Sequence, residues 1–281
     1  DTVTTPAELA RWARSVGRHP RRIASDVGEV VQGALSLGDR LRPNVELSIE
    51  GTIGPHRRWM WARTTLDEIK EVRSALGGTV NDVVLTAISR GFRDLLVGRG
   101  EDVKDVVVRT LVPVSVRSHD DHSPSNQVSA MIAELPVGIA DPVERLEAVR
   151  SQMHELKGSH QADAATVIND LADFTPPVLL ALGLRTATSV LRRMPQRSVN
   201  TVTTNVPGPQ VPLYACGREM LDYFPFVPVS HGVRTGVAIL SYNRKMSFGI
   251  TGDWDTVPDL DVLAGGIEAG MDELLSLARK S

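Results

Sequence analysis

The chain has 281 residues, of which 42% are hydrophobic and 23% are charged, a balance typical of a globular protein that buries a core. Its formal net charge of −3 provides no basic surface for nucleic acid, and no apolar run approaches the roughly 20 residues that cross a bilayer. The single cysteine, Cys216, excludes an internal disulfide, and we expect a buried, unreactive thiol in a cytoplasmic protein.

Residues 1–45 carry two weak helical patterns that glycine and proline interrupt, among them Gly17 and Pro20. Such a segment suits a connector between domains better than a core. The chain also begins at Asp1 rather than at methionine. We therefore expect a helical connector from an upstream domain over 1–45, followed by one domain over 46–281.

An extended stretch to Arg63 precedes the first well-defined helix. Thr65 and Glu68 have the spacing of a capping box, in which a threonine side chain and a glutamate side chain satisfy each other's backbone N–H groups. Apolar residues then recur at spacings of three and four as far as Leu76, and Gly77 with Gly78 ends the pattern. The sequence predicts a helix between these signals.

A second helix is predicted from Thr79, because a threonine cap precedes apolar residues that recur at helical spacing as far as Leu96. Asn81 and Asp82 then lie in its first turn. An acidic residue in that position stabilises the partly positive end of a helix. On spacing alone, we expect Asp82 to cap or brace the helix.

A strand is predicted over 106–117, a polar loop over 118–125 and a returning strand over 127–135. The loop contains His119 and His122 with two aspartates between them, which raises the question of a metal site. A flexible loop without a cysteine or a third histidine is a poor zinc site. We therefore predict a solvated loop and no metal.

The remaining elements alternate without a repeat. A helix is predicted over 141–157, and an apolar helix over 176–194 that either packs in the core or rests at a membrane interface. Strands near 199–204, 219–227, 233–241 and 246–252 precede a closing helix over 259–279, with a hairpin turn at 242–245. This order predicts a layered α/β or α+β fold in which helices cover a mixed sheet, and it excludes a Rossmann fold.

The most unusual strand runs from Asn200 to the turn Pro207–Pro209 and is rich in short hydrogen-bonding side chains. Alternation places Thr203 and Asn205 on one face and Thr204 on the other. Such side chains either form a solvated edge or stabilise a polar transition state. Periodicity alone leaves open which face looks into a site.

Three segments together resemble the C-terminal half of the bacterial wax ester synthase/diacylglycerol acyltransferase family. They are Val80–Leu85, Val112–Arg117 and Asn200–Pro209, and they occur in the family's order. The resemblance implies a fold similar to chloramphenicol acetyltransferase and the carnitine acyltransferases. It also implies transfer of a long acyl group from acyl-coenzyme A, as co-substrate, to diacylglycerol or a long-chain alcohol, with no resident cofactor.

The resemblance also implies roles for particular residues. Supporting catalytic residues, which would stabilise the oxyanion of the tetrahedral intermediate, are Asn81, Thr203, Thr204 and Asn205. Residues implied on the substrate side are Arg117, Asn126, Gln127, Pro207 and Gly208. Arg117 suits an ion pair or a brace between domains, with a coenzyme A phosphate contact as the alternative, and the Pro-Gly turn also has a structural role.

The family's general base lies in a His-His-x-x-x-Asp-Gly motif, and this sequence has none. His231 is the best internal substitute, while a serine hydrolase is excluded because no G-x-S-x-G motif is present. We expect an upstream domain to supply the histidine, and a peripheral location on the inner membrane or on lipid droplets. The alternative is a non-catalytic lipid-binding or interaction module with the same fold.

Overall fold

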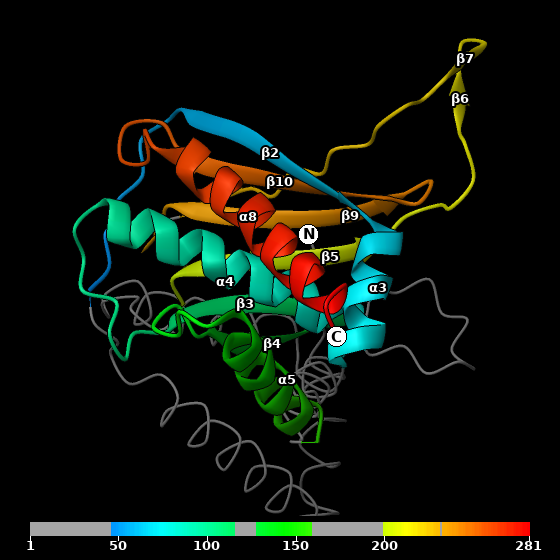
Figure 1. Ribbon diagram of the computed structural model, residues 1–281. Coiled ribbons are helices and arrows are strands. Elements are labelled where there is room, and N and C mark those ends of the chain that lie inside the picture. The colour runs from blue at the N-terminus through cyan, green and yellow to red at the C-terminus, as the bar shows by residue number, and fades with distance from the viewer. Residues whose placement is uncertain (1–45, 116–127, 159–198, 231) are drawn as a thin grey trace, which may run out of the picture. The chain divides into compact units, whose positions relative to one another are not determined.

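The computed structural model describes residues 46–115, 128–158, 199–230 and 232–281 (Figure 1). Ranges 44–114, 130–158 and 199–281 form one compact unit. Several predictions lie outside the described residues: the connector over 1–45, the loop over 118–125 with His119 and His122, the helix over 176–194, and the candidates Arg117, Asn126, Gln127 and His231.

The unit is built on a six-stranded mixed sheet. Its strand order is β2 (Arg57–Thr65), β10 (Lys245–Asp253), β9 (Thr235–Tyr242), β5 (Thr201–Pro207), β3 (Val108–Ser115) and β4 (Val128–Leu135). The pairs β2–β10 and β10–β9 are antiparallel, whereas β9–β5 and β5–β3 are parallel. Two short pairs lie apart from it, β1 (Glu50–Gly51) with β8 (Gly232–Val233) and β6 (Tyr214–Ala215) with β7 (Arg218–Glu219). The predicted mixed sheet is confirmed.

Helices cover one face of this sheet (Figure 1). They are α3 (Leu66–Leu76), α4 (Val80–Gly98), α5 (Pro142–Gly158) and α8 (Leu260–Ala278). The long helices α4 and α8 cross at Gly91 and Gly266, where the absence of side chains lets them approach closely. A Cβ added to Gly266 would lie only 2.8 Å from the Cα of Gly91. Between helices and sheet lies a core that includes Phe92, Phe248 and Ile267, each fully buried.

The helix boundaries follow the caps predicted from sequence. The side chain of Thr65 accepts from the backbone N–H of Glu68 at 3.1 Å, and the Glu68 carboxylate accepts from the N–H of Thr65 at 2.8 Å. The hairpin turn between β9 and β10 is also confirmed, since Asn243 and Arg244 both have positive φ, 44° and 67°. Two positive values match the twist of the flanking strands.

The strand predicted over 219–227 is wrong. Only the two-residue β7 forms there, and residues 220–230 pair with no strand of the described ranges. Pro225 and Pro228 lack the N–H that a ladder needs. The segment instead crosses the sheet face opposite the helices, where a Cβ on Gly249 would overlap the carbonyl oxygen of Pro225.

Candidate functional site

Strand β5 presents different side chains to its two faces. Thr201 and Thr203 face the helix-covered core. Thr203 lies beside Val237 of β9, which is part of that core, and Thr201 lies on the same face of β5. Thr203 is only 1% exposed, and its Oγ1 accepts a hydrogen bond from Oγ1 of Thr110 at 2.8 Å. The hydroxyl of Thr201 donates to the carbonyl of Thr235 at 2.9 Å. These bonds tie β5 to both of its neighbours.

Thr204 points to the opposite face of the sheet and is half-buried. Asn205 lies on the helix side, next to Ile239 of β9, and is half-buried because the strand is close to its end. No hydrogen bond to the hydroxyl of Thr204 or to the side-chain amide of Asn205 occurs among the described residues. Both side chains therefore keep donors for a ligand.

The turn after β5 is held against the end of β9. The N–H of Gly208 donates to Oγ of Ser241 at 3.2 Å, and the N–H of Asn243 donates to the carbonyl of Pro209 at 3.0 Å. A Cβ on Gly208 would overlap the carbonyl oxygen of Ser241. Glycine is thus required for a close backbone approach, and Pro207 with Gly208 fixes where β5 ends.

The first turn of α4 lies at the same end of the sheet as the end of β5 (Figure 1). Oγ1 of Thr79 accepts from the N–H of Asp82 at 3.3 Å, and Oδ2 of Asp82 accepts from the N–H of Thr79 at 2.7 Å. This reciprocal pair satisfies two N–H groups that helix geometry leaves free. Asn81 lies between Thr79 and Asp82 in the same turn and is half-buried.

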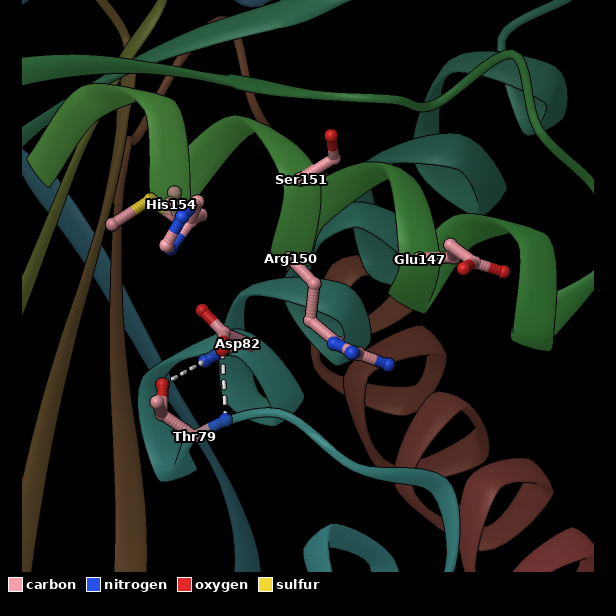
Figure 2. Close-up of a pocket in the computed structure, with 7 residues that line it drawn as sticks. Thr79, Asp82, Glu147, Arg150, Ser151 and His154 are labelled. Atoms are coloured by element: carbon pink, nitrogen blue, oxygen red, sulfur yellow. Dashed lines mark hydrogen bonds between the residues drawn. The ribbon is translucent and has the colours of Figure 1, made fainter. Parts of the chain in front are cut away.

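A pocket of about 400 Å³ opens beside this turn, between α4 and α5 (Figure 2). It is lined by Thr79, Asp82, Glu147, Arg150, Ser151, Met153 and His154. Asp82 is buried, whereas Glu147, Arg150 and His154 are exposed at the rim. The sequence analysis did not predict this pocket. The available signal was the spacing of three and four between the polar residues of α5, which places them on one face of the helix.

The cysteine prediction is corrected by the structure. Cys216 is exposed, in the turn between β6 and β7, with a positive φ of 52°. The hairpin of β6 and β7 projects away from the sheet (Figure 1). The described ranges contain no group of three His, Cys, Asp or Glu side chains that would hold a metal, and none of their helices has the length and apolarity to cross a membrane.

Comparisons with known proteins agree with this architecture. The family model of the WS/DGAT C-terminal domain matches residues 125–275. A probable diacylglycerol O-acyltransferase of Mycobacterium tuberculosis is 37% identical over 276 residues, which are 98% of this chain and 57% of that protein. The chain therefore spans little more than half the length of this relative.

Solved structures share the fold. The wax ester synthase/diacylglycerol acyltransferase from Marinobacter aquaeolei VT8 has a TM-score of 0.66 and 23% identity, over 89% of this chain and 57% of that one. The trichothecene 15-O-acetyltransferase from Fusarium sporotrichioides has a TM-score of 0.56 and 12% identity, over 89% and 52%. Helices on one face of a mixed sheet, with a polar strand end beside a helix start, thus define an α/β acyltransferase fold. The chain belongs to the WS/DGAT C-terminal domain family.

Proposed function

We propose that this chain is the C-terminal part of an O-acyltransferase. The enzyme would move a long acyl group from acyl-coenzyme A to the hydroxyl of diacylglycerol, giving triacylglycerol, or to a long-chain alcohol, giving a wax ester. The match of the family model to residues 125–275 carries this proposal. The diacylglycerol O-acyltransferase names of relatives that align with almost the whole chain support it.

The chemistry needs a general base and an oxyanion site. A histidine from the His-His-x-x-x-Asp-Gly motif of an upstream domain would take the proton of the acceptor hydroxyl. The alkoxide then attacks the thioester carbonyl, and the tetrahedral intermediate collapses to an ester and the thiolate of coenzyme A. The histidine returns its proton to that thiolate, so that the proton balance closes.

Residues of this chain would supply the oxyanion donors. Thr204 and Asn205 are the candidates, because both are half-buried near the end of β5 and keep free donors. They face opposite sides of the sheet, so one of the two, and not both, would donate to a given oxyanion. Thr203 would act indirectly, since its buried hydroxyl accepts from Thr110 and holds β5 beside β3. Asn81, at the same end of the sheet, would contact the substrate, and Pro207 with Gly208 would shape the site.

Partners and location extend the proposal. The acceptors are apolar lipids, so the enzyme would work at the surface of the inner membrane or of a lipid droplet. Arg117, Asn126 and Gln127 remain proposed for the substrate side or for a brace to the upstream domain. The domain division proposed from sequence, a connector over 1–45 and a domain over 46–281, fits this arrangement.

The test measures release of coenzyme A from palmitoyl-coenzyme A with dioleoylglycerol and, separately, with hexadecanol. We expect turnover by the 281-residue chain together with the upstream domain, and none by the chain alone, because the base is missing. Thin-layer chromatography of the products distinguishes triacylglycerol from wax ester.

Two outcomes would contradict the proposal. Turnover by the chain alone would show that the base lies within these 281 residues. No turnover by the complete protein with either acceptor, while it still binds dioleoylglycerol, would favour the non-catalytic lipid-binding module.

A further inference from the structure

The carboxylate of Asp82 has one oxygen that no hydrogen bond among the described residues uses. Oδ2 accepts from the N–H of Thr79 in the helix cap, whereas Oδ1 is buried and has no hydrogen-bond partner. The residue is only 4% exposed. A buried acceptor without a donor costs free energy, so a group that donates to Oδ1 would bind favourably there.

Asp82 lines the pocket between α4 and α5, with Oδ1 just beneath its surface. In Figure 2 it points from the first turn of α4 toward α5, which carries the other side chains at the rim. Arg150 does not pair with it, because its Nη1 donates to the carbonyl of Leu76 at 3.4 Å and its Cδ and Cγ pack over Gly78. The pocket volume of about 400 Å³ suffices for a small polar molecule.

We propose that this pocket binds a zwitterion of the phosphoethanolamine type, with its ammonium on Oδ1 of Asp82 and its anionic group toward Arg150 and His154. This site goes beyond the acyl transfer reaction and does not rest on it. The ligand follows from the charged and polar groups around the pocket, which are an unpaired carboxylate oxygen at its buried side and, at its rim, the Arg150 guanidinium, the His154 ring and the Glu147 carboxylate.

An ammonium fits the buried side better than the other common cation. A guanidinium binds a carboxylate through two parallel hydrogen bonds, and Asp82 offers one oxygen only. An ammonium is compact and directs its donors singly, so one N–H suffices for Oδ1 of Asp82, and the Glu147 carboxylate at the rim adds a second negative charge to the lining. A lone anion is disfavoured, because it would face the unpaired carboxylate oxygen.

The anionic group is placed by the rim. Arg150 and His154 lie one turn apart on α5, so their side chains project to the same side of the helix. A phosphate there gains charge-assisted hydrogen bonds from the guanidinium. In one bound molecule, the ammonium therefore lies next to the Asp82 carboxylate and the phosphate next to the Arg150 guanidinium.

Calorimetric titration of the purified protein tests the proposal with three probes: O-phosphoethanolamine, ethanolamine and inorganic phosphate. We expect affinity to fall in that order. The key variant is Asp82→Asn, since the amide oxygen still accepts from the N–H of Thr79 while an NH₂ replaces the free oxygen. This substitution should weaken O-phosphoethanolamine at least about tenfold.

Arg150→Gln separates the two halves of the site. It should reduce the affinity for O-phosphoethanolamine to that for ethanolamine and leave ethanolamine itself unchanged. Absence of heat with O-phosphoethanolamine, equal binding by Asp82→Asn, or equal binding of phosphate alone would each overturn the proposal. If Asp82→Asn does not fold, the Arg150→Gln comparison and the ranking of probes still decide.

The same chemistry occurs free and as a lipid head group. Sedimentation with phosphatidylcholine vesicles, with and without phosphatidylethanolamine, distinguishes these sources. Binding that needs phosphatidylethanolamine and that Asp82→Asn abolishes assigns the head group. Binding of O-phosphoethanolamine without vesicle binding assigns a free ligand. If the protein binds neither O-phosphoethanolamine nor the vesicles, the proposed site is disproved.

Discussion

Thr203 and Thr204 are neighbours in the sequence, yet the pleat of β5 gives their hydroxyls opposite environments. The hydroxyl of Thr203 is buried against Thr110, whereas that of Thr204 is half-buried on the face without helices. A valine substitution preserves shape and removes only the hydroxyl. The two positions therefore separate structural support from contact with a reacting group.

We predict that Thr203→Val destabilises the protein by about 1–3 kcal/mol, because the buried hydroxyl of Thr110 loses its acceptor. Thr204→Val should leave stability within about 0.5 kcal/mol and lower kcat of the complete enzyme by about 10²-fold, the effect of losing one oxyanion donor. Urea denaturation and coenzyme A release measure the two effects. The reverse pattern, with a large loss of stability at Thr204 and none at Thr203, would refute the assignment of faces.

At the scale of secondary structure elements, one ion pair joins the end of α4 to the start of α8. Arg99, the C-cap of α4, donates Nε to Oδ2 of Asp259 at 2.7 Å and Nη2 to Oδ1 at 2.5 Å. Hydrogen bonding from the Arg99 guanidinium holds the pKa of Asp259 below its ordinary value. A lowered carboxyl pKa stabilises the folded state above the ordinary value, and this contribution is lost as pH falls through the folded-state pKa.

We predict that Asp259→Asn costs about 1–2 kcal/mol of unfolding free energy at neutral pH, the range for a half-buried carboxylate that accepts two hydrogen bonds from a guanidinium. The difference from wild type should shrink below pH 3.8, the ordinary carboxyl value, because protonated aspartic acid resembles asparagine. Urea melts at several pH values measure it. The matched control is Asp67→Asn at the exposed Arg244–Asp67 pair, and a pH-independent Asp259→Asn effect would contradict the prediction.

The segment over 220–230 is another test at this scale, because it packs across the sheet without pairing to it. Gly249→Ala should displace it, since the new Cβ would overlap the carbonyl oxygen of Pro225. We predict a loss of about 1–3 kcal/mol and faster proteolysis of this segment. Gly265→Ala is the control: nothing lies within 4 Å of its Cβ, and alanine in α8 should be neutral or stabilising. Equal stability of the two variants would refute the packing.

The helices and the hairpin turn were predictable because their signals are local. Thr65 and Thr79 cap helices within three residues, and Asn243 with Arg244 forms a turn by itself. The sheet order was not predictable, since β2 pairs with β10 from the far end of the sequence. Likewise, alternation divided β5 into two faces, but only the packed helices determine which face is buried.

The candidate site was predicted only where one strand carries it. The donors at the end of β5 follow from a single segment, whereas the pocket at Asp82 exists because α5 packs beside α4. The strand predicted over 219–227 failed for a related reason: its β-forming residues Leu221, Tyr223 and Phe226 are exposed on a chain that passes over the sheet. Propensity does not reveal whether a partner strand is present.

At the scale of the whole molecule, exposed apolar side chains gather at the end of β5 and on the segment between β5 and β9. Those exposed are Val206, Val211, Leu213, Tyr214, Leu221, Tyr223 and Phe226. Trp61 of β2 is 45% exposed, and its ring lies 5.7 Å from that of Phe224. So many exposed apolar groups along one segment are typical of an interaction surface.

We predict that the isolated chain self-associates and binds the hydrophobic dye ANS, because these side chains are exposed. Adding the upstream domain should abolish both effects. Light scattering after size-exclusion chromatography measures the first, and dye fluorescence the second. Substitution of Tyr214, Leu221 and Phe226 by serine provides the control, since it should make the isolated chain monodisperse. A monodisperse wild-type chain without dye binding would disprove the prediction.

The pairing of β2 with β10 also determines when the protein is able to fold during its synthesis. Strand β2 leaves the ribosome well before its partner β10 and the helix α8 that covers it. Until then, Ala62 and the core side of α4 face solvent or a chaperone instead of their final neighbours. The sheet is completed only after β10 has been translated. A ribosome that stalls before Lys245 therefore releases a chain in which β2 has no β10 to pair with.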